Sequence, residues 1–180
     1  MTKIVTTDTP KEAVPTPDQA LHTLSIFVNN KPGVLMRITQ VFARRGFNID
    51  SLVVSQSRDD RYSRMTIGIT GSSNGLEQIV KQVFKLVDVI KCQEHTTANA
   101  VVKEMLLIKF LVDSDKRTEA LQIIDHFAGR GQDITPTSMI AMITGDPNKL
   151  DAAIKMFSLF EIVETVRTGK VVIARGDLET

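Results

Sequence analysis

The chain has 180 residues and a formal net charge of +1, with 22 basic residues against 21 acidic ones. This balance excludes the strongly basic surface on which binding to nucleic acid or to an anionic membrane depends. Tryptophan is absent and Cys92 is the single cysteine. An internal disulfide is therefore impossible, and we expect a reducing, cytoplasmic location.

Residues 1–20 are rich in threonine, proline and charge, and they contain few large apolar side chains. This composition predicts a disordered leader. The stretch lacks the apolar core of a secretory signal, and no apolar run in the chain is long enough to span a bilayer.

The stretch from His22 to Ser51 predicts a strand, a polar loop, a helix and the start of a second strand. Leu24, Ile26 and Val28 alternate with Thr23, Ser25 and Phe27, which is the period of a strand with one face on a core. After the loop, apolar residues recur at helical spacing; they are Val34, Leu35, Ile38, Val41 and Phe42.

The loop from Asn29 to Gly33 is the candidate binding site. Pro32 is expected at the first position of the helix, where a proline loses no intrahelical bond, and Gly33 lets a ligand approach the backbone closely. The free N–H groups of the first helical turn suit a carboxylate. Asn30 offers an amide donor and a carbonyl acceptor to the two ends of an amino acid. The simpler interpretation is that Asn30 and Gly33 only form the turn.

The remaining patterns of the first half complete a β-α-β-β-α-β order. They comprise a strand at 48–55, a polar hairpin at 57–61, a strand at 64–69, a turn at 71–75, a helix at 76–83 and a strand at 87–93. After a polar break at 95–99 the order repeats, with a strand at 105–112, a helix at 121–128, strands at 133–136 and 139–144, a helix at 150–157 and an extended stretch at 162–174 that bends at Thr168-Gly169. We therefore predict an α+β protein with two ferredoxin-like βαββαβ modules in tandem.

The two halves also match each other in sequence. Residues 42–49 match 127–134 at an offset of 85, and residues 70–81 match 144–155 at an offset of 74. The difference, 85 − 74 = 11, predicts that the central hairpin of the second module is shorter by 11 residues. At the offset of 85, Asn30, Pro32 and Gly33 become Asp115, Arg117 and Thr118, so the second module is expected to lack the candidate site.

A converging catalytic constellation is absent from the sequence. His22, His95 and His126 are scattered, and none has zinc-ligand spacing with Cys92. We expect His22 at the edge of a strand and His126 on a helix surface. An RNA-binding module of this order needs exposed aromatic residues on its central strands, which carry Val, Met, Ile and Ser here, and a metallochaperone needs a cysteine pair.

Several motifs resemble those of the small regulatory subunits of acetolactate synthase, also called acetohydroxyacid synthase. They are NNKPGVLMRI at 29–38, FARRGFNIDSLVV at 42–54, SRMTI at 63–67, the helix and strand that run from Leu76 to Ile90, and the stretch from Arg167 to Gly176. The motifs also occur in the same order and at the same spacing as in that family. The resemblance covers the chain from about His22 to Gly176.

The resemblance implies an N-terminal ACT domain at 21–96 that binds an amino acid, a linker at 97–101, an ACT-like C-terminal domain at 102–176 and a tail at 177–180. It also implies a homodimer in which two ACT domains pair side by side. The effector would then lie between Asn30, Gly33, Val34 and Leu35 of one protomer and Asn48 and Ile49 of the other.

The function that the resemblance implies is regulatory rather than catalytic. The partner would be the large catalytic subunit, which carries thiamine diphosphate, magnesium and FAD, and no cofactor is expected on this chain. The small subunit would raise the activity of its partner and make it sensitive to valine or another branched-chain amino acid. The alternative is a free-standing ACT-type amino-acid sensor that acts on a different enzyme.

Overall fold

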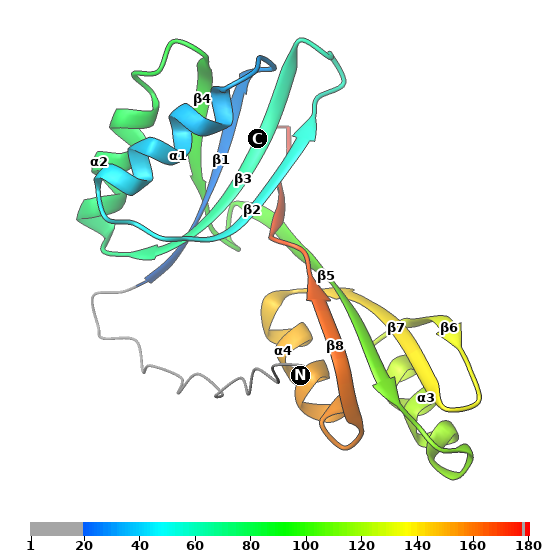
Figure 1. Ribbon diagram of the computed structural model, residues 1–180. Helices are drawn as coiled ribbons and strands as arrows, with labels where there is room; N and C mark the ends of the chain where they lie inside the picture. Colours follow the sequence, from blue (N-terminus) through cyan, green and yellow to red (C-terminus); the bar gives the residue numbers. More distant parts are fainter. Residues whose placement is uncertain (1–19, 178) are drawn as a thin grey trace, which may run out of the picture.

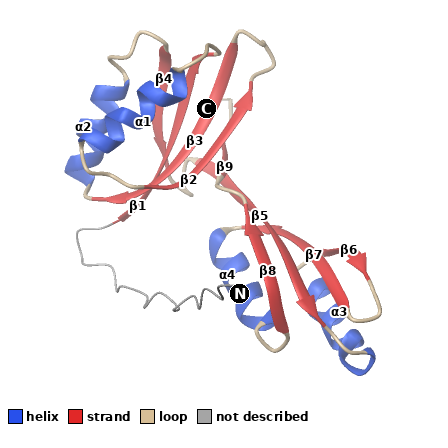
Figure 2. Ribbon diagram, viewed as in Figure 1, coloured by secondary structure: helices blue, strands red, loops and turns tan. Residues whose placement is uncertain are grey.

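The structure, a computed structural model, describes residues 20–177 and 179–180. The expected disordered leader therefore lies outside the described residues, except for Ala20, which is the first residue of strand β1. Two units follow each other along the chain, and each has an antiparallel sheet with two helices on one face (Figures 1 and 2). The first sheet has four strands, and the second has five because a short last strand also pairs with its central strand. The prediction of two ferredoxin-like modules is confirmed.

The first unit runs from β1 to β4. Its elements are β1 (Ala20–Asn29), α1 (Val34–Arg44), β2 (Ile49–Gln56), β3 (Tyr62–Gly71), α2 (Ser73–Val83) and β4 (Val89–His95). The strands lie in the order β2-β3-β1-β4, so β1 is central. Leu24, Ile26 and Val28 are fully buried against both helices, as their alternation predicts.

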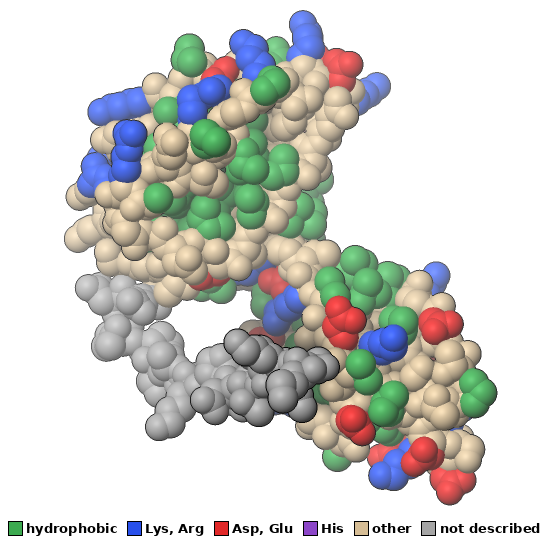
Figure 3. Space-filling model, in the orientation of Figure 1, with side chains coloured by type: hydrophobic (Ala, Val, Ile, Leu, Met, Phe, Trp, Pro, Cys, Tyr) green, Lys and Arg blue, Asp and Glu red, His purple; other side chains and the backbone are tan. Residues whose placement is uncertain are grey.

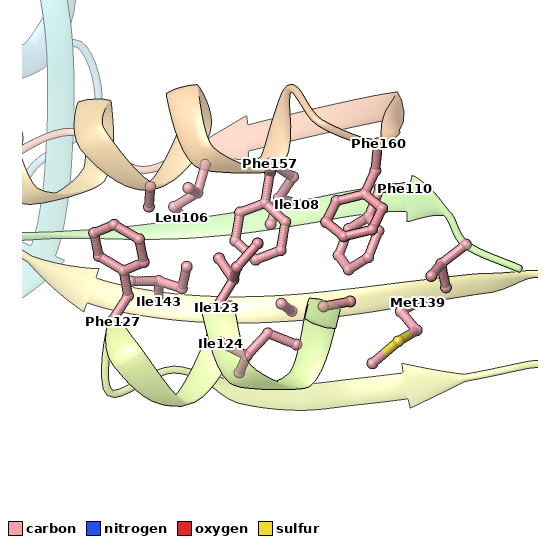
Figure 4. Packing of buried hydrophobic residues seen from close by; sticks show 14 of the residues in the cluster. Leu106, Ile108, Phe110, Ile123, Ile124, Phe127, Met139, Ile143, Phe157 and Phe160 are labelled. Atoms are coloured by element: carbon pink, nitrogen blue, oxygen red, sulfur yellow. The ribbon is translucent and has the colours of Figure 1, made fainter. Parts of the chain in front are cut away.

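The second unit repeats this plan. Its elements are β5 (Ala100–Leu111), the 3₁₀ turn η1 (Ser114–Lys116), α3 (Arg117–His126), β6 (Arg130–Ile134), β7 (Ser138–Gly145), α4 (Pro147–Phe157), β8 (Glu161–Arg167) and β9 (Val171–Ala174). The core lies between the sheet and its two helices, where the Phe110 ring is centred 4.9 Å from Phe157 and 5.3 Å from Phe160 (Figure 4). No helix in the described part of the chain is long and apolar enough to cross a membrane.

Two element boundaries differ from the sequence-based expectation. Helix α2 begins at Ser73, inside the expected turn, because the Ser72 hydroxyl accepts the N–H of Gly75 at 3.3 Å and caps the helix. Strand β5 begins at Ala100, so the last two residues of the expected linker belong to a strand. The first part of β5 pairs with β9, with Val101 opposite Ile173.

The central hairpin of the second unit is shorter than that of the first, as predicted, but its first strand begins earlier than expected. Strand β6 starts at Arg130 rather than at Asp133. The cause is the abrupt end of α3: Ala128 adopts a φ of 48°, and the N–H of Gly129 returns to the carbonyl of Ile124 at 2.8 Å. The chain therefore joins the second sheet directly after the end of α3, without an intervening loop.

The end of the chain returns to the first unit. Residues 169–177 and 179–180, here called the C-terminal segment, lie over the face of the first sheet that the helices leave open (Figure 1). The Lys170 ammonium lies 3.4 Å from the Thr23 hydroxyl, and the Lys91 ammonium donates to the carbonyl of Glu179 at 2.6 Å. Thr180 is only 6 % exposed, and its hydroxyl accepts the N–H of Ala174 at 2.7 Å.

Candidate functional site

The loop between β1 and α1 forms a tight turn. The N–H of Val34 lies 3.4 Å from the carbonyl of Lys31, and Gly33 has φ 80° and ψ −4°. Pro32 and Gly33 therefore hold the second and third positions of a type II turn, the positions that favour proline and glycine. The helix begins at Val34, so the expectation that Pro32 is its first residue was wrong.

The N-terminus of α1 has a positive electrostatic potential. It has no side-chain cap and no acidic residue in its first turn, so no side chain of that turn neutralises the positive end of the helix dipole. A pocket of about 170 Å³ lies beside this turn and is lined by Asn30, Gly33, Val34 and Leu35, together with Val54 and Met65 among others. Four of the six predicted site residues thus meet in one place.

Asn30 has a structural role that the sequence did not reveal. Its carboxamide nitrogen donates to the carbonyl of Asp60 at 2.9 Å, and its backbone N–H donates to the carbonyl of Arg61 at 2.7 Å. Both bonds hold the β2–β3 hairpin against the loop. One of the two amide N–H donors of Asn30 is therefore already used, and its carboxamide oxygen can still accept a hydrogen bond from a ligand ammonium.

Two basic side chains lie near the helix start. Arg37 donates to Asp88 at 2.5 Å, and the Lys31 ammonium lies 3.9 Å from the same carboxylate, which is buried. A Cβ added to Gly33 would lie 3.2 Å from the Arg37 guanidinium. The positive φ favours glycine here, and the Arg37 side chain would have to shift by a few tenths of an ångström to admit a side chain at this position.

Asn48 and Ile49 lie away from this pocket in the same protomer. They follow the far end of α1, a helix of 11 residues, which spans about 16 Å. The Asn48 carboxamide lies 3.3 Å from Asp50, whose other oxygen accepts the Thr70 hydroxyl at 2.8 Å. Within one chain a small molecule cannot contact both ends of the helix.

The corresponding position in the second unit is closed. The 3₁₀ turn η1 takes the place of the open loop, and the guanidinium of Arg117 donates to the carbonyls of Thr135 and Pro136, both at 2.7 Å. These bonds tie the start of α3 to the β6–β7 hairpin. The substitution of Pro32 by Arg117 between the two modules therefore fills this end of the second unit.

Sequence reasoning missed two residues that line the pocket and the burial of one histidine. Val54 and Met65 are opposite each other in the β2–β3 register, and only their strand pairing would have placed them beside the loop. His22 is close to the start of β1, as expected, but it is also buried. It lies on the central strand, 7 % exposed, with one ring nitrogen 2.7 Å from Glu94 and the other 3.1 Å from the carbonyl of Gly71.

Known protein families match both units of the chain. Residues 24–91 match a model described as an AHAS small subunit-like ACT domain, and residues 103–176 match one described as the small subunit of acetolactate synthase. A probable acetolactate synthase small subunit of Archaeoglobus fulgidus is 41 % identical over 156 residues, which cover 87 % of this chain and 98 % of the relative.

A second relative and a solved structure agree with these matches. An acetolactate synthase small subunit of Mycobacterium bovis is 39 % identical over 155 residues, covering 86 % of this chain and 92 % of the relative. The crystal structure of the acetolactate synthase small subunit from Thermotoga maritima superposes with a TM-score of 0.79 at 38 % identity, covering 88 % of this chain and 99 % of that one.

Proposed function

Because this chain belongs to the family of acetolactate synthase small subunits, we propose that it binds the large catalytic subunit, raises its activity and makes it sensitive to a branched-chain amino acid such as valine. The large subunit would hold thiamine diphosphate, magnesium and FAD and would condense two pyruvates to 2-acetolactate. This chain would contribute no cofactor and no catalytic residue.

The observation that carries the proposal is the uncapped start of α1 beside a small pocket. The effector carboxylate would accept the free N–H groups of the first turn. Its ammonium would meet the carboxamide oxygen of Asn30, and its branched side chain would lie on Val54 and Met65. A volume of about 170 Å³ suits one small amino acid better than a nucleotide or a peptide.

The contribution of Asn48 and Ile49 requires a second protomer. Strand β2 is at the edge of its sheet, so two copies can join by pairing their β2 strands. In an antiparallel pair the start of one β2 would lie near the end of the other, which brings Ile49 of one protomer toward Val54 of its partner. The effector would then bridge two protomers, and its binding and the pairing would be thermodynamically linked.

Substitution of Gly33 by aspartate tests this site. The added carboxylate would repel that of the effector and occupy the start of the helix itself. We expect Gly33→Asp to abolish inhibition by valine in assays of the reconstituted complex while activation of the large subunit is largely retained.

Gly33→Asn is the matched control, because asparagine has nearly the same shape, tolerates a positive φ equally well and carries no charge. It should retain more of the valine response than the aspartate variant. If Gly33→Asp responds to valine as the parent does, the site is elsewhere. If the large subunit does not co-purify with this chain but valine still binds, the alternative of a free-standing sensor is favoured.

A further inference from the structure

A hollow of about 500 Å³ lies where the two units meet. Its lining comes from β1 and β2 of the first unit and from β5, α4 and the stretch around the end of β8 in the second. Figure 3 shows basic and acidic side chains gathered at this junction. The charged residues of the lining are Asp50, Glu104, Asp151, Arg167 and Lys170. None of them lines the pocket beside α1, so the hollow is a second, separate cavity.

The guanidinium of Arg167 is engaged by groups of the second unit. It donates to the carboxylates of Glu104 at 2.5 Å and Asp151 at 2.6 Å, and to the carbonyl of Pro147 at 3.2 Å. Glu104 is only 7 % exposed. Because Arg167 is paired directly with it, the negative charge of this buried carboxylate is compensated.

Lys170 is also buried, but among the described residues it has no carboxylate partner. It is 9 % exposed, its ammonium lies 3.4 Å from the Thr23 hydroxyl, and it takes part in none of the ion pairs. Thr23, like Ser25 and Thr66, is a buried polar residue on the outer face of the first sheet, which the C-terminal segment covers. Burial lowers the pKa of Lys170 below its ordinary value of 10.5, because an ammonium without an opposite charge is costly to remove from water. An ammonium has three donors, so Lys170 can still donate to an anionic ligand.

The two other carboxylates of the lining limit the charge of that ligand. Asp50 and Asp151 are exposed to solvent, where water and salt screen a charge much more strongly than in the interior. They therefore do not replace a direct partner for the Lys170 ammonium. They would, however, repel a second negative charge, so the hollow favours a ligand with one anionic group over a phosphate or a dicarboxylate.

The lining also has apolar surface from both units. Leu21 and Leu52 belong to the first unit and Pro147 belongs to the second, and Leu21 is 55 % exposed. The Ser51 hydroxyl lies in the same lining and is a further donor. This combination suits a molecule that has a short hydrocarbon chain beside its anionic group.

We propose that the hollow binds a small organic monocarboxylate, whose carboxylate accepts hydrogen bonds from the Lys170 ammonium and whose apolar chain lies on Leu21, Leu52 and Pro147. Such a molecule contacts both units at once, so its binding favours the arrangement in which they meet. The site requires no ammonium on the ligand and does not depend on the site beside α1.

Isobutyrate tests the proposal, because it has a carboxylate and a short branched chain but no ammonium. In two-dimensional NMR spectra of the full chain labelled with nitrogen-15, we expect isobutyrate to shift the amide signals of Ser51, Thr168 and Gly169 in a saturable way. Isobutyramide has nearly the same shape without the charge, so it should bind at least about tenfold more weakly. Succinate, with its second carboxylate, should also bind more weakly. Absence of the shifts, or equal binding of either comparison compound, would overturn the proposal.

Two charge-removing variants test the role of Lys170. Lys170→Met keeps a long side chain without the ammonium, and the dissociation constant for isobutyrate should rise at least about tenfold. Arg175→Met is the matched control, because it removes the same charge from an exposed position of the C-terminal segment outside the lining, and it should bind as the parent does. Equal binding by both variants would contradict the site. The comparison with isobutyramide uses the parent chain alone, so it holds even if Lys170→Met does not fold.

Gly33→Asp separates this site from the one beside α1. This variant should bind isobutyrate as the parent does, because Gly33 does not line the hollow. If Gly33→Asp abolishes the binding of isobutyrate, then isobutyrate occupies the pocket beside α1 and the proposal of a second site is wrong.

Discussion

At the scale of single residues, the candidate site combines groups that the sequence identified with groups that it could not. The turn residues Pro32 and Gly33 are recognisable because a type II turn favours them at these positions. The commitment of Asn30 to the β2–β3 hairpin, at 2.9 Å from the carbonyl of Asp60, depends on tertiary contacts. A single sequence does not specify which of the functional groups of an asparagine stays free.

Asn48 tests the proposal that the site is completed by a second protomer. Its carboxamide contacts Asp50 on the exposed surface at 3.3 Å, so Asn48→Ala should leave the fold intact. A hydrogen bond to a charged ligand group contributes about 1.5–3 kcal/mol, so we expect calorimetry to show that the affinity for valine falls by at least about tenfold. Asn74→Ala, on the exposed surface of α2, is the control. Equal affinities for both variants would contradict a site that spans two protomers.

At the scale of elements, strands and helices with strong periodicity were predictable. The alternation of Leu24, Ile26 and Val28 located β1 to within two residues, because every second side chain of a strand with one buried face points into the core. The start of β5 was not predictable. Ala100 and Val101 follow a polar break, and they form a strand only because β9, more than 70 residues later, pairs with them.

Strand β4 contains a group that makes stability depend on pH. The His95 side chain is 7 % exposed, and neither ring nitrogen has a hydrogen-bond partner among the described residues. Burial, with the nearby charges of Arg64 and Lys91, lowers the pKa of His95 below its ordinary value of 6.5. As the pH falls through about 6.5, the unfolded chain binds a proton at this position before the folded one does. The free energy of unfolding should therefore decrease, by at most about 1.4 kcal/mol per pH unit.

Denaturant titrations between pH 7.5 and 5 would measure this effect. The variant His95→Gln remains neutral throughout the range and serves as the reference. We expect the parent to lose stability relative to this variant as the pH falls below about 6.5. Parallel curves for the two proteins would show that His95 does not contribute.

At the scale of the whole molecule, the duplication was visible in the sequence but the contact between the two units was not. The offsets of 85 and 74 residues predicted the repeat and its shortened hairpin. The packing of the C-terminal segment on the first sheet depends on small contacts, such as that between Lys170 and Thr23. The sequence around Lys170 and the sequence around Thr23 contain no pattern that predicts the contact between these two residues.

Gly169 lies where the C-terminal segment meets β2. A Cβ at this position would lie 2.9 Å from a methyl group of Val53 and 3.3 Å from the backbone nitrogen of Leu52. Gly169→Ala should therefore separate the two units or strain β2, and overpacking of this kind costs about 1–3 kcal/mol. Thermal unfolding would measure the loss. Gly131→Ala is the control, because its Cβ would meet Ile134 at an ordinary 3.6 Å. Equal melting temperatures for the two variants would contradict a tight contact at Gly169.

The return of the C-terminal segment also has a consequence for synthesis on the ribosome. The first sheet is complete once His95 has been added, but the segment that covers it ends 180 − 95 = 85 residues later. At about 5–20 residues per second this delay is roughly 4–17 s. Thr23, Ser25 and Thr66 can bind water during that time, whereas an apolar surface would expose the nascent chain to aggregation. The polar side chains on a face that is buried in the finished protein thus suit the order in which the chain is made.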